Sequence, residues 1–154
     1  MTVKERLEKL GITLPAAAAP VANYVPYVIS GNLISISGQI PMGPTGLEFK
    51  GQVGNSVSPE EALSAARLCG INIIAQLDAA LDGDLDRVVR IVKLGGFVNC
   101  VSEFAGQPQI INAASDLMVD VFGDKGRHSR SAVGTNALPL NVPVEIDALV
   151  EITA

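Results

Sequence analysis

The chain has 154 residues, of which 48% are hydrophobic, and a formal net charge of −5. A chain of this length can bury the core of a single domain without disulfides or a metal. The acidic balance offers no clustered basic face for phosphate backbones, which argues against nucleic acid as a partner.

Cysteines are few, since only Cys69 and Cys100 occur and neither has the neighbouring ligands typical of a zinc site. We therefore expect no disulfide framework and no metal. Charges interrupt the first ten residues, where a signal peptide needs an apolar run, and no stretch reaches the roughly 20 apolar residues that cross a bilayer. A soluble, cytoplasmic protein without membrane contacts is predicted, and its positive mean hydropathy favours a homo-oligomer.

The N-terminal segment carries Val3, Leu7 and Leu10 at helical spacing among charged residues, and Gly11 follows as a helix stop. A short amphipathic helix is therefore predicted over the first ten residues. The alanine- and proline-rich stretch behind it is typical of a stiff, extended connector. The whole chain is predicted to be one domain, with residues 1–22 as its N-terminal helix and connector.

Two β-rich runs, residues 25–30 and 33–37, flank Gly31-Asn32, a pair that accepts the positive φ of a tight turn. This pattern predicts a hairpin. Isoleucine and serine alternate in the second run, so one of its faces should be buried and the other small and polar. Residues 42–55 contain four glycines and a proline and are predicted to form a surface loop.

The most regular helical pattern begins at the capping box Ser58-Pro59-Glu60-Glu61 and runs to Gly83. Residues 88–101 are β-rich and contain the pair Gly95-Gly96, which indicates a β-bulge or a close backbone approach. A second helix is predicted from Pro108 to Phe122. Two strands follow, and the last of them alternates apolar and mostly acidic or polar residues from Val144. We expect an α+β fold, a mixed sheet with both helices packed on one face.

Arg130 and Glu145 are the candidates for chemistry. Arg130 has small neighbours, and its planar guanidinium suits bidentate binding of a carboxylate; the alternative is an ordinary surface arginine paired with a nearby acid. Glu145 is the first outward carboxylate of the last strand. It could orient a water or accept a proton beside a bound anion, or it could be a solvated acid of the strand face.

Other catalytic arrangements find little support. His128 precedes Ser129, but adjacency in sequence does not supply the geometry of a serine-hydrolase triad. Lys93 could act as a Schiff-base amine only if an apolar pocket buried it, which its neighbours do not indicate, so a solvated lysine at the end of a strand is expected. The glycines of residues 43–54 form no nucleotide-binding fingerprint, and no cofactor is expected.

Several segments, in the same order, resemble the reactive-intermediate deaminase family, known as Rid, YjgF-like or endoribonuclease L-PSP. Residues 33–41 resemble its strand ending in SGQIP. Residues 129–133, the pair Leu138-Pro139 and residues 144–148 resemble its signature of R-x-x-V, LP and a closing (V/I)EIEA strand. The resemblance covers about residues 24–152, and the N-terminal extension is similar to that of a distinct branch.

The resemblance implies a homotrimer of chorismate-mutase-like fold (bacillus type) with small-molecule clefts between adjacent subunits. It implies hydrolysis of reactive enamines or imines, such as 2-aminoacrylate or a related 2-imino acid, to a 2-keto acid and ammonia without metal or cofactor. Arg130 would bind the substrate carboxylate, and Glu145 would hold or activate the attacking water.

The remaining residues that the resemblance implicates would complete the cleft. Tyr24 and Asn112 would line or order it, and backbone groups of Gly38 and Ala132 would contact the ligand. Ala132 stands where the best-known members have a cysteine.

Two other interpretations stay open. The same fold could serve as a non-catalytic module that binds a 2-keto acid through Arg130, with a regulatory role. Some relatives carry the labels endoribonuclease or translation inhibitor, against which the acidic balance and the single histidine of this chain count.

Overall fold

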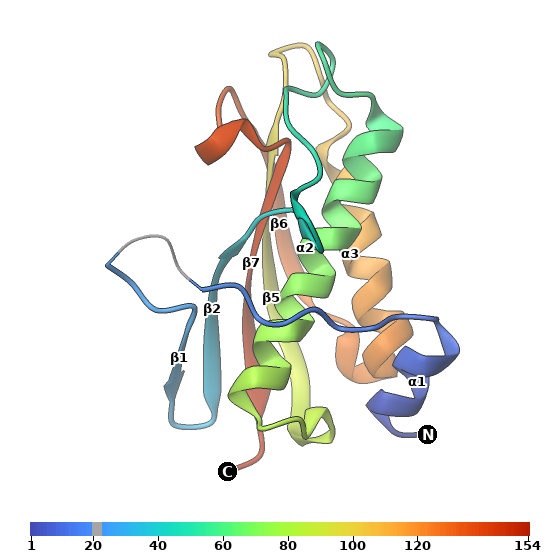
Figure 1. The fold of residues 1–154 in the computed structure, drawn as a ribbon, viewed down its shortest axis with the longest axis vertical. Coiled ribbons are helices and arrows are strands. Elements are labelled where there is room, and N and C mark those ends of the chain that lie inside the picture. Colours follow the sequence, from blue (N-terminus) through green and yellow to red (C-terminus); the bar gives the residue numbers. More distant parts are fainter. Residues whose placement is uncertain (20–22) are drawn as a thin grey trace.

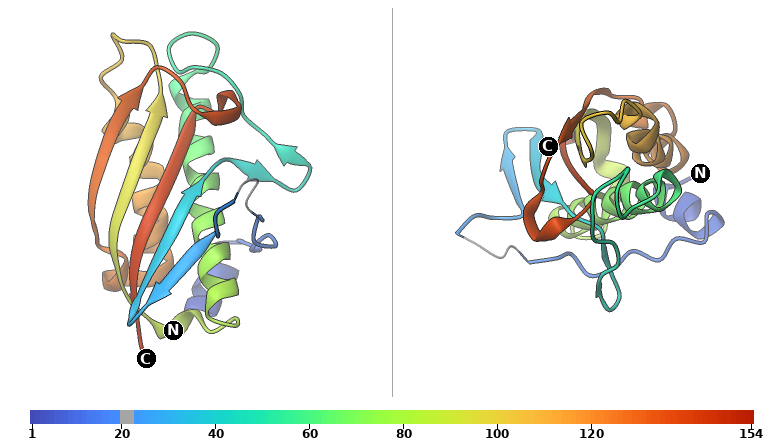
Figure 2. Two further views of the ribbon diagram at one scale, coloured as in Figure 1. Left: turned by 90° about the vertical axis from the view of Figure 1, so that its left-hand side faces the viewer. Right: turned by 90° about the horizontal axis from the view of Figure 1, so that it is seen from above.

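The computed structural model describes residues 1–19 and 23–154 as a two-layer α+β fold (Figure 1). Its helices and strands, in chain order, are α1 (Val3–Lys9), β1 (Tyr27–Ser30), β2 (Leu33–Gln39), β3 (Met42–Gly43), β4 (Gly46–Leu47), α2 (Pro59–Ala80), β5 (Val88–Asn99), α3 (Gln107–Phe122), β6 (Ser129–Thr135) and β7 (Val144–Ile152). The main sheet has the order β1-β2-β7-β5-β6, and α2 and α3 cover one of its faces (Figure 2). The predicted fold class is confirmed.

Both long helices lie close to where the sequence predicts them. The Ser58 hydroxyl accepts the backbone N–H of Glu61 at 3.2 Å, so the predicted capping box begins α2, which ends shortly before Gly83. Helix α3 begins at Gln107, directly before the predicted Pro108. Within residues 1–19 and 23–154, no helix has the length and apolar character required to span a membrane.

Strand β7 lies at the centre of the sheet. It pairs antiparallel with β2 on one side and with β5 on the other, while β6 adds parallel to β5. Val144, Ile146 and Ala148 are buried beneath the helices, whereas Glu145 and Asp147 face the uncovered side. The predicted alternation along this strand is therefore confirmed, and it defines a helix-covered face and an open face of the sheet.

A β-bulge interrupts β2 at Ser37-Gly38. The step from Ile36 to Gln39 covers three residues of β2, whereas the paired step from Ala148 to Ile146 covers two residues of β7. One extra residue on β2 is the definition of a bulge, and bulges re-aim side chains at the ends of strands. Here Gln39 becomes buried while Ser37 and Gly38 stay partly exposed.

The Gly95-Gly96 pair is a site of close approach, and the predicted alternative of a bulge is wrong. Strand β5 stays in register with β7 through both glycines, and its register shifts lie nearer its start. A Cβ on Gly96 would lie 2.6 Å from the Ile111 side chain of α3, and one on Gly95 would overlap the Asp147 carboxylate. Glycine is required because side chains on both faces touch this backbone.

The prediction of a surface loop over residues 42–55 is only partly correct. Strands β3 and β4 form a small, partly exposed hairpin, but Val53 is completely buried. Its N–H donates to the carbonyl of Asn99 at 2.8 Å, and its carbonyl accepts the N–H of Val101 at 3.0 Å. The loop therefore returns to the sheet at its second half, a long-range pairing that turn residues do not reveal.

The N-terminal helix α1 packs its buried Val3 and Leu7 against the main core. Leu10 is 39% exposed because the helix ends before it, so its predicted place in the apolar stripe is wrong. Residues 12–19, here called the strap, then run across α2 (Figure 1). The last part of the predicted connector, residues 20–22, lies outside the described residues.

Candidate functional site

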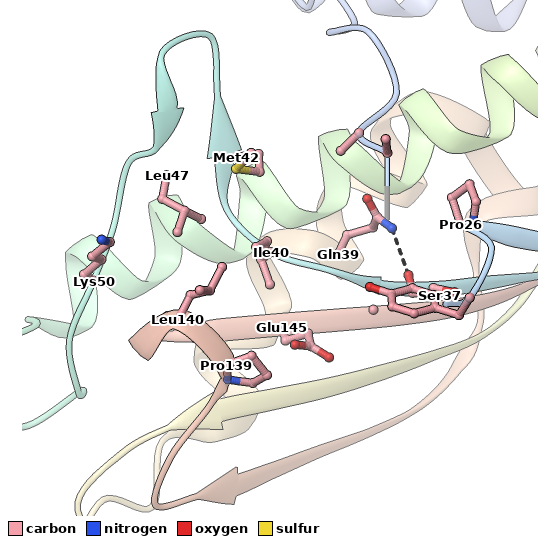
Figure 3. Close-up of a pocket in the computed structure, with 14 residues that line it drawn as sticks. Pro26, Ser37, Gln39, Ile40, Met42, Leu47, Lys50, Pro139, Leu140 and Glu145 are labelled. Carbon is pink, nitrogen blue, oxygen red and sulfur yellow. Dashed lines mark hydrogen bonds between the residues drawn. The ribbon is translucent and has the colours of Figure 1, made fainter. Parts of the chain in front are cut away.

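A pocket of about 680 Å³ opens where β2 ends beside β7. This volume falls within the range of roughly 300–1,000 Å³ that small-molecule sites occupy. Its walls come from the strap, the end of β2, the β3–β4 hairpin and a short 3-10 turn, η3 (Pro139–Asn141), as Figure 3 shows. Tyr24, Gly38 and Glu145, three of the predicted site residues, all line this pocket.

Glu145 projects from the open face of β7 across the β2 bulge. A Cβ on Gly38 would overlap the Glu145 carboxylate, so glycine at this position is what lets the carboxylate lie against the strand. Burial raises the pKa of the Glu145 carboxyl, and the neighbouring negative charge of Asp147 raises it further. A carboxyl group of this kind gains and loses its proton at a higher pH, closer to neutrality, than a solvated glutamate does.

Asp147 lies on the same face of β7, beside Gly95. Burial raises the pKa of the Asp147 carboxyl, although a hydrogen bond from the Gly95 backbone and the positive charge of Lys93 oppose the rise. The sequence interpretation did not single out Asp147. The alternation of β7 was the available signal, because residues two apart in a strand share a face.

Arg130 lies at the other edge of the sheet, on β6, where α3 covers it. Its Nη1 donates to the Ser115 hydroxyl at 3.1 Å and its Nη2 to the carbonyl of Pro108 at 3.2 Å. Among the described residues, the one salt bridge joins Arg127 to Asp124, so Arg130 faces no carboxylate. The alternative of an arginine paired with a nearby acid is therefore wrong for this structure.

His128 extends this network on the far side of Ser115. Its Nδ1 lies 2.6 Å from the carbonyl of Gly126, which can only accept, so Nδ1 carries a proton. In the neutral ring Nε2 then accepts the Ser115 hydroxyl proton at 2.8 Å, which leaves the hydroxyl oxygen free to accept from Arg130. The histidine thus orients the serine that holds the arginine, a role that adjacency in sequence gave no reason to expect.

Asn112 and Ala132 belong to the same edge. Asn112 is exposed on α3, four residues after Pro108 and three before Ser115, so it shares their stripe of the helix. Ala132 is two residues beyond Arg130 on β6 and packs partly against the core. The predicted residues Asn112, Arg130 and Ala132 therefore gather here, away from the pocket.

The two groups lie on opposite faces of the sheet. Leu94 of β5 pairs with both Arg130 and the buried Ala148, so the arginine is on the helix-covered face while Glu145 is on the open face. Strand β5 also separates β6 from β7, which puts their backbones roughly 10 Å apart. A small molecule held by Arg130 does not reach Glu145 of the same copy.

Comparison with known proteins identifies the family. Residues 4–152 match the family model described as "YjgF/chorismate mutase-like, putative endoribonuclease". The chain belongs to the YjgF family.

Similar proteins come from distant organisms. The YjgF-family chain is 50% identical to Protein TCP17 of Trypanosoma cruzi over 151 residues, which cover 97% of this chain and 94% of the relative. It is 51% identical to Atu1372 of Agrobacterium tumefaciens, a protein of unknown function with a crystal structure. The TM-score is 0.92, and the match covers 98% of this chain and 92% of that chain. A "putative endoribonuclease" structure from Shewanella oneidensis has 36% identity and a TM-score of 0.95, with coverage of 99% and 100%.

The YjgF fold thus places the six predicted site residues in two clusters, which we call the pocket cluster (Tyr24, Gly38 and Glu145) and the edge cluster (Asn112, Arg130 and Ala132). In the described part of the chain, no group of three or more histidine, cysteine, aspartate or glutamate side chains is placed to hold a metal ion. The roles of the six site residues toward a ligand stay predictions.

Proposed function

We propose that this protein is a cytoplasmic homotrimer that hydrolyses reactive 2-imino acids, or the enamines from which they form, to 2-keto acids and ammonia. The observation that carries the proposal is the position of the Glu145 carboxylate, which lies over Gly38 in an open pocket. Burial there raises the pKa of this carboxyl group. A positioned carboxyl group that exchanges protons readily is what addition of water to an imine requires.

The chemistry needs little beyond orientation and proton transfer, because an imine carbon is already electrophilic. Glu145 takes a proton from the attacking water as the oxygen bonds to the imine carbon, and the electron pair of the C=N bond moves to nitrogen, which takes up that proton. A second proton passes from the new hydroxyl through Glu145 to the nitrogen. The C–N bond then breaks, ammonia leaves and the carbonyl of the 2-keto acid forms.

Arg130 supplies the binding of the substrate carboxylate in this proposal. Its guanidinium is oriented by Ser115 and Pro108 but has no acidic partner among the described residues, so its charge is not neutralised within the chain. A carboxylate bound in two-point fashion would complete its hydrogen bonds. Asn112, on the same stripe of α3, would order that carboxylate.

Two copies of the chain are needed to bring the clusters together, because Arg130 and Glu145 lie on opposite faces of one sheet. We therefore place each catalytic cleft between the edge cluster of one copy and the pocket cluster of the next. Exposed apolar side chains on the open face, such as Phe97, Val133 and Val28, favour covering by another copy.

The first experiment measures ammonia release from freshly generated 2-imino acids, with spontaneous hydrolysis at matched pH subtracted. Wild type should accelerate release, and Arg130→Ala and Glu145→Gln should each lose the acceleration. Arg127→Ala and Glu151→Gln are matched controls, since Arg127 pairs with the exposed Asp124 and Glu151 lies farther along the open face of β7. Unchanged turnover in Arg130→Ala would refute the site, and saturable 2-keto acid binding without turnover in wild type would favour the binding module.

A mixing experiment tests the shared cleft. Arg130→Ala and Glu145→Gln chains, each inactive alone, are unfolded together and refolded as mixed oligomers. Some clefts then combine the intact Glu145 of one copy with the intact Arg130 of another, so a fraction of wild-type activity should return. Activity that stays absent in verified mixed trimers would place both residues in one copy and contradict the proposal.

The family description also includes endoribonuclease. The net charge of −5 gives poor electrostatic attraction to a phosphate backbone, so we favour the deaminase. RNA cleavage that survives purification and is lost in Glu145→Gln would reverse this preference.

A further inference from the structure

The pocket around Glu145 is apolar on one side. Figure 3 shows Leu47, Ile40 and Leu140 on one side of the carboxylate and Ser37 on the other. The apolar side also receives Met42 from β3 and the methyl groups of the strap. Lys50 lies at the same end of the pocket, and the other side chains that a ligand extending from Glu145 toward the β3–β4 hairpin would meet there are apolar.

The polar side chains at the floor of the pocket are engaged within the protein. The Ser37 hydroxyl donates to the carbonyl of Val25 at 2.8 Å. The amide nitrogen of Gln39 donates to the carbonyl of Ser37 at 2.9 Å, while its oxygen accepts from Gln76 at 3.4 Å. These groups have less hydrogen-bonding capacity left for a polar substituent.

Buried amides of α2 hold two of the pocket walls by their backbones. The side-chain nitrogen of Asn72 donates to the carbonyl of Met42 at 3.0 Å, which positions the start of the β3–β4 hairpin. The side-chain nitrogen of Gln76, one helical turn later, donates to the carbonyl of Ala18 at 2.9 Å, which positions the strap. Buried amides are costly without partners, so these bonds fix the walls.

A third buried amide holds the η3 turn. The side-chain nitrogen of Asn99 donates to the carbonyl of Val142 at 3.2 Å and lies 3.4 Å from the Asn141 side-chain oxygen. In this turn Leu140 has a φ of 59° and its side chain is 59% exposed at the pocket. A leucine in the left-handed region is strained, and such strain persists where the surrounding structure imposes it, most often at functional sites.

The polar side chains that are buried in the described part of the chain share one task, since each holds backbone around this pocket: Gln39, Asn72, Gln76 and Asn99. Maintaining four buried amides around an apolar space indicates that the shape of that space matters to function.

We infer that this pocket takes the apolar side chain of a large 2-imino acid, such as the imine of leucine, methionine or phenylalanine, and that such acids are its substrates in preference to 2-aminoacrylate. A three-carbon acid has no side chain long enough to cover the apolar wall of this pocket, which measures about 680 Å³ in a single copy. The inference rests on the proposed deaminase function and names the substrate class of that same site.

The test compares kcat/KM for the imines of leucine and of alanine, each generated in the assay by an amino-acid oxidase with catalase present. Burying the additional carbons of the leucine side chain should favour it about tenfold or more. Equal values, or a preference for the alanine imine, would overturn the inference and leave the deaminase function in place.

Variants then locate the preference in the apolar wall. Leu47→Ala and Leu140→Ala should lower kcat/KM for the leucine imine about fivefold or more, and should lower it less for the alanine imine. Leu63→Ala is the matched control, because Leu63 is an exposed leucine of α2 that does not line the pocket. Equal losses for both imines, or none in either wall variant, would contradict the assignment of the wall.

If wild type accelerates neither imine, the proposed function fails and binding decides the inference. Tighter binding of 4-methyl-2-oxopentanoate, the keto acid of leucine, than of pyruvate, weakened by Leu47→Ala, would still support an apolar side-chain pocket. Equal affinity for the two keto acids would overturn it.

Discussion

The two faces of the sheet differ in how completely they bury their side chains. The helix-covered face is filled by aliphatic residues such as Ile91, Ile146 and Val150, all completely buried. On the open face, Glu145 and Asp147 are only partly buried and lie over glycines of the neighbouring strands. Along β7, alternate residues thus serve the core and the pocket in turn, and substitutions one position apart on this strand should have different consequences.

The largest contrast should come from the neighbours Glu145 and Ile146. Glu145→Gln removes the proton acceptor and should reduce turnover about 100-fold or more, without lowering the free energy of unfolding at neutral pH, because a partly desolvated charge is lost. Ile146→Ala leaves a cavity in the core and should cost about 2–5 kcal/mol. Steady-state kinetics and urea unfolding of both variants at one protein concentration measure these effects. A Glu145→Gln protein destabilised as strongly as Ile146→Ala would abolish the contrast.

Glycine substitutions sharpen the comparison within β5. Gly96→Ala pushes a methyl group into Ile111 of the packed core and should cost about 1–3 kcal/mol of unfolding free energy. Gly95→Ala meets only the Asp147 carboxylate, which can turn away, so its cost should be smaller. Thermal and urea unfolding compare the pair, and the reverse order would mean that the open face is the more tightly packed one.

The sequence predicted those parts of the molecule that local patterns encode. The capping box at Ser58 began α2, and the alternation from Val144 defined β7. It did not reveal the bulge at Ser37-Gly38 or the opposite faces of Arg130 and Glu145. Those depend on strand pairing between distant segments, and a one-residue shift in register exchanges the two faces.

A smaller effect should follow from loosening the arginine of the edge cluster. Ser115→Ala removes the hydroxyl that accepts from Arg130 and donates to His128, so the guanidinium loses one positioning bond. KM should rise about fivefold with little change in kcat, since a bond of this kind contributes about 1 kcal/mol. Ser115→Thr, which keeps the hydroxyl, should restore KM. A fall in kcat with unchanged KM would assign Ser115 a different role.

The smallest predicted effect is a shift in pH dependence. Asp147→Asn removes a negative charge that raises the pKa of Glu145, so the acidic limb of the activity profile should move to lower pH. Both carboxyl pKa values are raised in the folded protein, so their stabilising contribution is complete at low pH and is lost as pH rises through the raised values. The dependence of unfolding free energy on pH over that window should therefore be weaker in Asp147→Asn. An unmoved acidic limb would show that Asp147 does not influence Glu145.

The hydrogen bond between Gln76 and the strap bears on how easily this protein could be re-engineered. Gln76 contacts the main-chain carbonyl of Ala18, a group that every amino acid carries. The attachment of the strap is therefore independent of which side chains stand at residues 16–19. A library randomised at these positions would keep its anchor and the catalytic strand β7 while the wall facing the ligand varies, so ligand preference could be evolved apart from the reaction itself.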